Sequence, residues 1–485
     1  MNSEQYLKFV EVESTCSVES LYSSLFSGSD NSFWLDSSLV MEGYSRFSFI
    51  GDSEGELAKL VRYKKDDNEI EVLDGSARVN VYATLEEYIK QELSIAILIP
   101  PTYILPFATG FVGYFGYESL QADIEFKSKS VHKDAELILC DRFIAFDHLT
   151  QKYYFVVRHD DKGSTSASMW IDQCRHQLAG LEKSEAELIV KNPTEKDVVC
   201  RYVETQADYV QKVNECLDYI RAGESYEITL TTEIVTHSTS NHFEIYKCLR
   251  SINPAPYSAF IQFEEISLMC SSPERFLKID DQGNIESRPI KGTAPRSVDS
   301  ADDERQKKSL GDSVKTRSEN LMIVDLLRND IGKVCEMNSV RVPSLMQVES
   351  YSTVHQLVST ITGKLRNEIH SMDAIAAAFP GGSMTGAPKK RTMELIEALE
   401  SRWRGPYSGS IGYVSFDGQS DLNIVIRTLV ARENDITLGV GGAIVALSDP
   451  VEEYEEAMLK AQAPLTALRM SADTEQAYSG KVKVK

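Results

Sequence analysis

One stretch near the middle of the chain decides how the C-terminal half is interpreted: Ser287-Arg288-Pro289-Ile290-Lys291-Gly292-Thr293-Ala294-Pro295-Arg296. It places a lysine between an apolar residue and a glycine turn, with arginines on both sides. Isolated lysines are almost always solvated, so the stretch alone is more typical of an exposed turn. In a pocket, burial or a cationic neighbour such as Arg288 would lower the pKa of Lys291 and make its amine nucleophilic. The motifs that follow favour the pocket.

The composition argues against several classes of partner. The 485 residues carry 51 basic and 73 acidic side chains, for a net charge of -22. Such a chain repels phosphate backbones and anionic membranes, so we expect neither nucleic acid nor membrane as a partner. The eight cysteines form no CxxC pair, and the polar N-terminus is unlike a signal peptide. Scattered cysteines of this kind are typical of reduced core residues, so we expect a cytoplasmic protein.

The order of the expected elements favours an α+β fold. Strand-like runs occur at 46–51, 152–157, 226–235, 257–263 and 266–271, and helical spacing occurs at 167–185, 207–222, 319–329, 387–399 and 451–468. Strands and helices do not alternate in a regular βαβ rhythm, so we expect large, mostly antiparallel sheets. The length suggests two domains. A polar connector at 191–197 then divides the chain into an N-terminal region at 1–195, a second domain at 196–470 and a polar tail at 471–485.

Two glycine-rich loops and one acidic helix face are candidates for binding. Residues 380–388 form a loop that enters a helix, where backbone amides and the helix dipole favour an anion, although an ordinary tight turn explains the loop equally well. The glycines of residues 439–443 can mark the close approach of a ligand. Glu453, Glu456 and Lys460 share one face of the last helix. Two carboxylates together suit Mg²⁺, whereas acidic runs are more often solvated surface.

Several motifs together resemble a known family. The chain resembles component I of the 4-amino-4-deoxychorismate synthases, within the group of chorismate-using enzymes that includes anthranilate and isochorismate synthases. The resemblance is specific over about residues 204–468 and weaker in the N-terminal half. The motifs that carry it are Gly223-Glu224-Ser225-Tyr226-Glu227, Ser272-Pro273-Glu274-Arg275-Phe276, Pro289-Ile290-Lys291-Gly292-Thr293, Asp325-Leu326-Leu327-Arg328-Asn329-Asp330, Gly386-Ala387-Pro388-Lys389 and Gly409-Ser410-Ile411-Gly412-Tyr413.

The resemblance implies a fold and a role for each candidate residue. The fold would be that of anthranilate synthase component I, with its large sheets packed face to face and its helices outside. Lys291 would be the nucleophile, and Glu274 the general acid that helps the 4-hydroxyl of chorismate leave. The expected Mg²⁺ ligands are Glu319, Glu453 and Glu456, and the metal would hold the ring carboxylate. The expected substrate contacts are Tyr407, Arg427, Gly442 and Lys460 near the pyruvyl carboxylate, and Ser383 and His355 along the ring.

Departures from related branches sharpen the expectation. The isochorismate branch carries a water-activating lysine at the position of Glu227, so hydroxylation at C2 is disfavoured here. Anthranilate synthases usually carry alanine where this chain has Lys291. Ala294 stands where a basic residue is often found. Trp34-Leu35-Asp36-Ser37-Ser38 resembles the segment that binds tryptophan in relatives, which makes Ser37 a candidate for a tryptophan pocket. A strand end followed by a turn explains that segment equally well.

The sequence therefore predicts amination of chorismate at C4 without loss of pyruvate, feeding 4-aminobenzoate and folate synthesis. One alternative is anthranilate synthase component I, which aminates C2 and eliminates pyruvate. An alternative of another class is a non-catalytic chorismate- or tryptophan-binding regulator, although a binder needs no general acid. No cysteine lies in a Gly-x-Cys-x-Gly setting, so we expect ammonia to come from a separate glutamine amidotransferase subunit.

Overall fold

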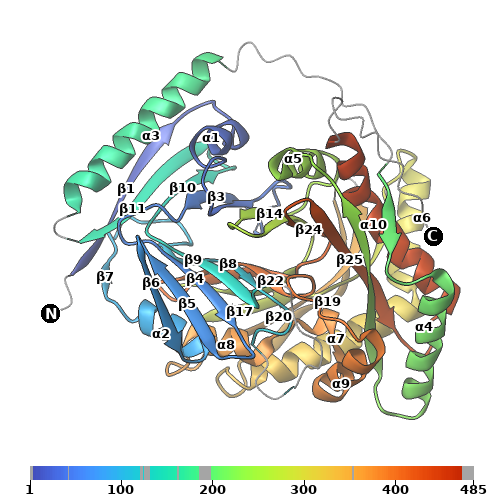
Figure 1. Cartoon of the computed structure of the whole chain (residues 1–485). Coiled ribbons are helices and arrows are strands. Elements are labelled where there is room, and N and C mark those ends of the chain that lie inside the picture. Colours follow the sequence, from blue (N-terminus) through green and yellow to red (C-terminus); the bar gives the residue numbers. More distant parts are fainter. Residues whose placement is uncertain are drawn as a thin grey trace.

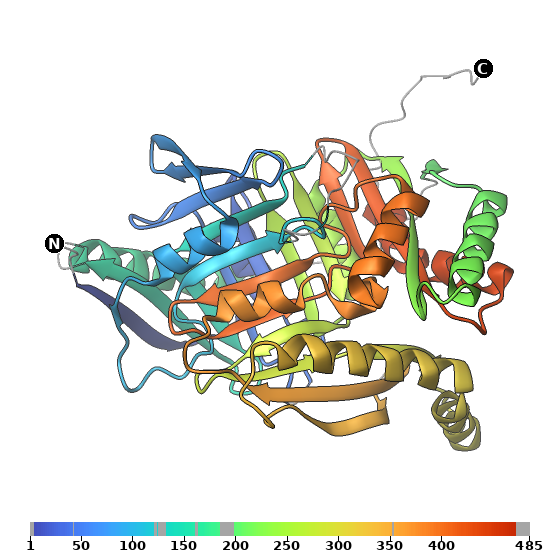
Figure 2. The same ribbon diagram turned by 90° about the horizontal axis from the view of Figure 1, so that it is seen from below.

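The computed structural model describes residues 4–41, 43–120, 124, 132–160, 163–184, 198–351 and 354–471. Two large sheets pack face to face, and the helices lie outside them (Figures 1 and 2). Within the described residues, strands β1 and β7 pair in parallel and all other named strand pairs are antiparallel. The expected α+β class, with face-to-face antiparallel sheets, is confirmed.

The first sheet contains strands from both halves of the chain. In spatial order these are β12 (Cys200–Tyr202), β13 (Glu227–His237), β25 (Asp435–Ile444), β24 (Thr428–Arg432), β15 (Ser267–Ser272), β14 (Tyr257–Gln262), β2 (Ser32–Asp36), β3 (Phe47–Asp52), β10 (Arg142–Asp147), β11 (Lys152–Asp160), β1 (Gln5–Glu13) and β7 (Ile97–Leu98). A short strand, β21 (Gly386–Ala387), adds to β13. The two halves join where β2 pairs with β14.

The second sheet is also shared between the halves. Its spatial order is β18 (Ile290–Pro295), β20 (Val354–Lys364), β17 (Asn284–Arg288), β16 (Arg275–Ile279), β23 (Ser420–Asn423), β22 (Ser410–Ser415), β8 (Gly110–Phe115), β9 (Ala135–Cys140), β4 (Lys59–Lys64), β5 (Glu69–Asp74) and β6 (Ala77–Tyr82). Strand β19 (Arg341–Ser350) pairs with β20 as well. Both sheets therefore cross the predicted boundary at residue 195, and the division into two functional regions stays a prediction.

Helices cover the outer faces of the two sheets. The first sheet is covered by α1 (Val18–Leu25), α3 (Ser164–Ser184), α5 (His242–Ile252), α10 (Pro450–Ser471) and α4 (Gln206–Arg221). The second sheet is covered by α2 (Leu85–Leu93), α7 (Val314–Gly332), α8 (Ser371–Ala378) and α6 (Ser300–Asp312). Helix α9 (Lys389–Glu400) packs on β13, after the one-turn helix η2 (Gly382–Met384). No helix in the described ranges combines the length and apolarity needed to cross a membrane.

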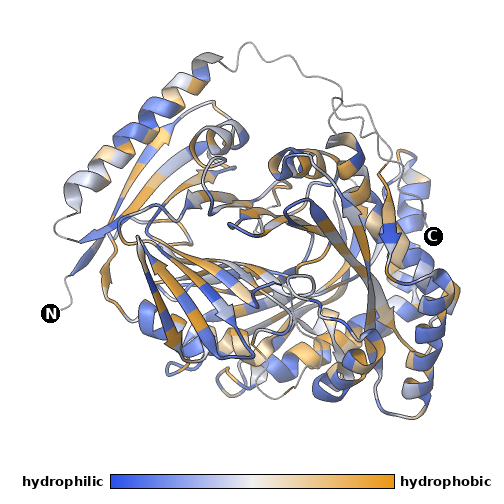
Figure 3. Ribbon diagram, in the orientation of Figure 1, coloured by the Kyte–Doolittle hydropathy of each residue, from blue (hydrophilic) through white to orange (hydrophobic). Residues whose placement is uncertain are grey.

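Strand residues alternate between two apolar layers because side chains on a strand point to opposite faces. In β14, Ala259 and Ile261 belong to the core between the sheets, whereas Phe260 packs under the outer helices. In β8, Val112 faces the inner core and Phe111 faces the helical layer. Figure 3 shows hydrophobic residues along these inner strands and hydrophilic faces on the outer helices. Burial on both faces explains why the strand sequences are continuously apolar.

Most elements expected from the sequence are present. The five expected helices correspond to α3, α4, α7, α9 and α10, although α7 begins earlier than expected, at Val314. Helix α4 ends in a glycine turn, since Gly223 follows the C-cap residue with φ +77°. All eight cysteines are free. The connector 191–197 and the tail beyond residue 471 lie outside the described residues.

Candidate active site

A β-bulge presents Lys291 to the interior. The register of β18 against β20 slips between Lys291 and Thr293, with Gly292 in the left-handed region at φ +77°. A Cβ atom at Gly292 would lie 2.5 Å from Thr316 Cγ2 and 2.8 Å from Leu310 Cδ1. Only glycine satisfies both the backbone and the space here. Lys291 is consequently buried, as the pocket interpretation of the sequence requires.

Lys291 forms an ion pair with a residue on the other sheet. Its Nζ donates a hydrogen bond of 2.9 Å to Oε1 of Glu227, which is completely buried in β13. Burial lowers the pKa of Lys291, but attraction by Glu227 and Glu319 outweighs it, so the pKa is raised. The expected lowering of this pKa is therefore wrong. Arg288, the expected cationic neighbour, is engaged elsewhere, because its guanidinium pairs with Glu349 at 2.6 Å and stacks on Tyr44.

Glu274 and Ser383 meet beside this pair. Ser383 Oγ donates to Glu274 Oε1 at 2.6 Å, and burial raises the pKa of Glu274 despite that hydrogen bond. A buried carboxyl with a raised pKa can remain protonated and act as a general acid. Lys291 also acts electrostatically on Glu274. The structure thus brings both predicted catalytic residues and Ser383 together.

Three side chains hold the glycine-rich loop that carries Ser383 by donating hydrogen bonds to the backbone carbonyls of the loop. Thr229 Oγ1 donates to Ser383 O at 3.0 Å, and Arg404 Nη1 donates to Met384 O at 2.7 Å. Lys389, which ion-pairs with Asp330 at 2.6 Å, donates to Pro380 O at 3.0 Å. These donors fix Ser383 against Glu274 from three sides. Anion binding by the amides of this loop stays a prediction.

The three predicted metal ligands lie on α7 and α10 around two lysines. Lys315 Nζ is 2.6 Å from Glu453 Oε1 and 3.9 Å from Glu319 Oε1, and Lys460 Nζ is 2.8 Å from Glu456 Oε1. Burial raises the pKa of Glu319 to about 7. No group of three or more histidine, cysteine or acidic side chains within the described ranges is arranged to hold a metal ion. Two of the carboxylates nevertheless converge on one ammonium, which marks a position that a cation can occupy.

The predicted substrate contacts fall into two groups. Gly442 and Lys460 lie with the carboxylates, because a Cβ on Gly442 would be 3.3 Å from Glu453 Oε2 and 3.6 Å from Lys460 Nζ. The positive charge of Arg427 acts on Glu274, and burial lowers the pKa of Arg427. Among the described residues its guanidinium has no hydrogen bond or ion pair. Such a cation is available for a substrate carboxylate.

Tyr407 and His355 contact other parts of the molecule. The Tyr407 ring lies against Gly439 and lines a separate cavity of about 220 Å³. Both ring nitrogens of His355 are engaged, Nδ1 with Ser350 Oγ at 2.8 Å and Nε2 with Asp303 Oδ1 at 3.0 Å. No described contact joins either residue to Lys291 or Glu274. Their predicted roles at the substrate stay predictions.

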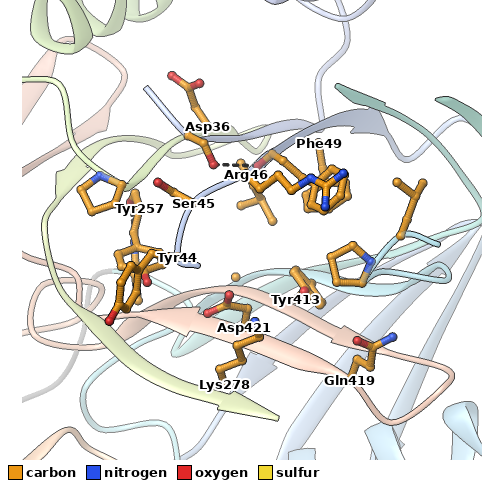
Figure 4. Close-up of a pocket in the computed structure, with 18 of the residues that line it drawn as sticks. Asp36, Tyr44, Ser45, Arg46, Phe49, Tyr257, Lys278, Tyr413, Gln419 and Asp421 are labelled. Carbon is orange, nitrogen blue, oxygen red and sulfur yellow. Dashed lines mark hydrogen bonds between the residues drawn. The ribbon is translucent and has the colours of Figure 1, made fainter. Parts of the chain in front are cut away.

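Ser37 lines a different and larger cavity. It measures about 700 Å³ and lies between the sheets, with Asp36, Tyr44 and Tyr257 on one side and Tyr413 and Asp421 on the other (Figure 4). Ser37 Oγ donates to Phe47 O at 2.7 Å. Tryptophan binding in this cavity stays a prediction.

Sequence reasoning missed two partners in the centre. The sequence marks Glu227 only as a departure from the isochorismate branch and predicts no role for Lys315. The signal for Lys315 was available, because Lys315 and Glu319 are four residues apart on one helix face. The pairing of Glu227 with Lys291 joins residues 64 positions apart on opposite sheets, and no local pattern reports it.

This fold and this centre define an α+β enzyme with a buried acid and a buried lysine. Residues 42–466 match the model of the chorismate binding enzyme family, and the chain belongs to that family. It is 40% identical over 474 residues to an aminodeoxychorismate synthase of Streptomyces pristinaespiralis, covering 96% of this chain and 66% of that protein. It is 38% identical to aminodeoxychorismate synthase component 1 of Klebsiella aerogenes, covering 76% and 79% of the two chains.

A solved structure agrees with the fold. Anthranilate synthase component I from Streptococcus pneumoniae superposes with a TM-score of 0.72 at 25% identity, covering 88% of this chain and 94% of that one. Several curated relatives are considerably longer, since the chain spans 50% to 66% of their length.

Proposed function

We propose that this chain aminates chorismate at C4, giving 4-amino-4-deoxychorismate and water. The observation that carries the proposal is the buried lysine of the bulge, paired with Glu227 and placed beside the Glu274–Ser383 hydrogen bond. A nucleophile at this position suits a substitution in which an enzyme group adds at C2 as the 4-hydroxyl leaves. The relatives described as aminodeoxychorismate synthases support the same choice.

The chain's own residues would carry out two displacement steps. Neutral Lys291 adds to C2, both ring double bonds shift by one position, and the C4–O bond breaks while Glu274 protonates the departing hydroxyl to give water. Ammonia then adds at C4, both double bonds shift back, and the C2–N bond to Lys291 breaks. The proton on the new amine returns to Glu274. Arg427 and Lys460 would hold substrate carboxylates, since a dianion in an acidic protein needs local cations.

The carboxylates of α7 and α10 offer the oxygen ligands that Mg²⁺ prefers. Glu319 and Glu453 converge on the ammonium of Lys315, with Glu456 one turn further along α10. Mg²⁺ prefers oxygen ligands and usually takes one or two carboxylates, with waters or substrate oxygens completing its shell. We propose that these three glutamates hold it, with Lys315 moving aside. Bound there, the ion would neutralise the ring carboxylate of chorismate.

We propose a separate glutamine amidotransferase subunit as the source of ammonia. The term component 1 in the description of the Klebsiella aerogenes relative supports a second component. The purified chain should use ammonium salts at high pH, where free ammonia is available, and should not use glutamine. Use of glutamine by the chain alone would contradict this proposal.

The rival activity is that of the structural relative, anthranilate synthase component I, with amination at C2 and loss of pyruvate. Incubation with chorismate, Mg²⁺ and an ammonium salt, followed by chromatography and mass spectrometry, separates the two. We expect an amino product that retains the pyruvyl group. Release of pyruvate with formation of anthranilate would refute the proposal.

A further inference from the structure

Glu227 is a buried carboxylate with one cationic partner. Its side chain is fully buried in β13, and Oε1 accepts the 2.9 Å hydrogen bond from Lys291. Oε2 has no hydrogen-bond partner within the described residues. Burial raises the pKa of Glu227, the ion pair with Lys291 opposes that rise, and Glu319 interacts electrostatically with Glu227 as well. A carboxylate held in this way is costly, because charge is removed from water with little compensation.

The backbone fixes this carboxylate in place. Ser225 Oγ donates to Glu227 O at 2.8 Å, and β21 pairs with β13 opposite Glu227. A Cβ on Gly386 would lie 1.9 Å from Glu227 O, so the two strands touch closely. Glu227 therefore cannot withdraw from Lys291 by a small backbone movement. Its carboxylate remains next to the reacting nitrogen.

The charges around Lys291 pose a chemical problem. Carboxylates act on it from four elements: Glu227 on β13, Glu319 on α7, Glu456 on α10 and Glu274 before β16. All four favour the ammonium, whereas a nucleophile must be the neutral amine. Within the described residues, Glu227 is the acid that lies within 4 Å of the Lys291 nitrogen. Glu274 is required in its protonated form for the leaving hydroxyl, so it cannot also receive the lysine proton.

We propose that Glu227 is a catalytic residue that takes the ammonium proton of Lys291 as chorismate enters. The inference rests on the proposed C4 amination. The transfer converts an ammonium and a carboxylate into an amine and a carboxylic acid, and the buried surroundings favour the uncharged pair once the substrate displaces water. When Lys291 leaves C2 as an amine, Glu227 returns the proton and the ion pair forms again. Atoms and charge balance over the cycle without a further reagent.

The test measures the first step alone. With chorismate and Mg²⁺ but no ammonia, the adduct on Lys291 is followed by rapid quench and intact-protein mass spectrometry across a pH series. Omitting ammonia prevents its own titration from shaping the profile. Glu227→Gln should slow adduct formation by roughly 10²–10⁴-fold near neutral pH, the usual size of a lost proton-transfer group. The acid limb of the profile should move to higher pH, because Lys291 must then lose its proton to solvent.

Controls separate this role from a structural one. Glu136→Gln removes another buried carboxylate that pairs with an arginine, Arg62, at 3.2 Å in the second sheet, and should leave the adduct rate unchanged. Glu227→Asp keeps an acceptor one methylene further away and should react at an intermediate rate with a near-normal acid limb. Thermal unfolding and chorismate binding show whether each variant is folded. If Glu227→Gln does not fold, Glu227→Asp decides the question.

The outcomes test the role of Glu227 separately from the proposed C4 amination on which it rests. If the wild type forms the Lys291 adduct and the C4 product, and Glu227→Gln does so at the same rate with the same pH profile, the role of Glu227 is refuted alone. If Glu227→Gln does not fold, a wild-type rate of adduct formation in Glu227→Asp likewise refutes the role of Glu227. If the wild type forms neither adduct nor C4 product, the proposed function is wrong and the inference falls with it.

Discussion

The charged centre around Lys291 and the cavity beside Ser37 use ion pairs in opposite ways. In the centre, the paired groups are those expected to react or to hold substrate, such as Lys291 with Glu227 and Lys315 with Glu453. In the cavity, the pairs brace the walls. Asp36, for example, accepts from Arg250 at 2.8 Å and from Tyr246 at 3.0 Å.

This difference determines what a ligand has to displace. In the centre, a substrate must separate the pairs of Lys291 with Glu227 and of Lys315 with Glu453 before these groups can react or bind it. In the cavity, Asp36, Arg46 and Asp421 already have charged partners, and the hydroxyl and aromatic surfaces of the walls remain for an occupant (Figure 4). Substitutions in the centre should therefore change rate, and substitutions in the cavity should change binding or stability.

The two regions meet around Tyr44. Tyr44 lines the cavity, and its ring lies 3.7 Å from the guanidinium carbon of Arg288, three residues before Lys291. Arg275, which follows Glu274, donates to Tyr44 O at 3.2 Å. Substitutions that lie away from this contact therefore compare the charged centre and the cavity most clearly, because they change one region without changing the other.

The largest effect is expected from removing metal. Chelation should abolish C4 amination and added Mg²⁺ should restore it, because the substrate carboxylate otherwise meets Glu319 and Glu453 without a divalent cation to bridge them. Turnover before and after chelation checks this. Glu456→Gln should raise the Mg²⁺ concentration needed, whereas Glu455→Gln, an exposed neighbour on α10, should not. Full activity in the chelated enzyme would contradict the proposed metal site.

Lys291→Ala should have the next largest effect. Loss of the nucleophile should lower the rate of C4 amination on the order of 10⁴-fold, since removing a covalent catalyst typically costs more than removing one proton donor. Chorismate binding should persist, residual amination should shift toward C2, and no adduct should be trapped. Lys59→Ala, which breaks a 2.9 Å pair with Glu92 far from the centre, is the matched control. A wild-type rate with the same product would make Lys291 a structural turn residue.

Glu274→Gln should lower the rate of C4 amination by about 10²–10⁴-fold, the usual contribution of a general acid. The pH dependence has a definite sign. Burial raises the pKa of Glu274, so the wild type stays active while this acid is protonated and loses activity as pH rises through its pKa. That alkaline limb should disappear in Glu274→Gln. In Ser383→Ala it should move to higher pH, because the serine hydrogen bond lowers the pKa of Glu274. An unchanged limb in both variants would exclude Glu274 as the acid.

The sequence predicted local features well and long-range ones poorly. Helical spacing located α4 and α10 to within a few residues, and the glycine turn at Gly292 signalled an unusual backbone. The pairing of β2 with β14 and of β8 with β22 joins distant segments, and strand patterns do not specify partners. The predicted lowering of the Lys291 pKa is wrong for the same reason, because it depends on contacts between distant segments. Arg288 is near in sequence but turned toward Glu349, whereas Glu227 is distant in sequence and in contact.

The smallest effect should come from Ser37→Ala in the cavity. The substitution removes the 2.7 Å hydrogen bond to Phe47 O, which should cost about 1 kcal/mol of unfolding free energy. Turnover without tryptophan should stay within about twofold of the wild type, because variants distant from the reacting groups leave transition-state contacts intact.

The same variant tests what the cavity binds. If tryptophan occupies it, calorimetry should show weaker binding in Ser37→Ala by about tenfold or less, the worth of one hydrogen bond. Ser14→Ala, at a half-buried serine that donates a hydrogen bond to Glu182, is the control. A large fall in turnover for Ser37→Ala, with folding intact, would mean that the cavity and the charged centre act as one site. The contrast between them would then be wrong, and the contact of Tyr44 with Arg288 would be the first place to look for the coupling.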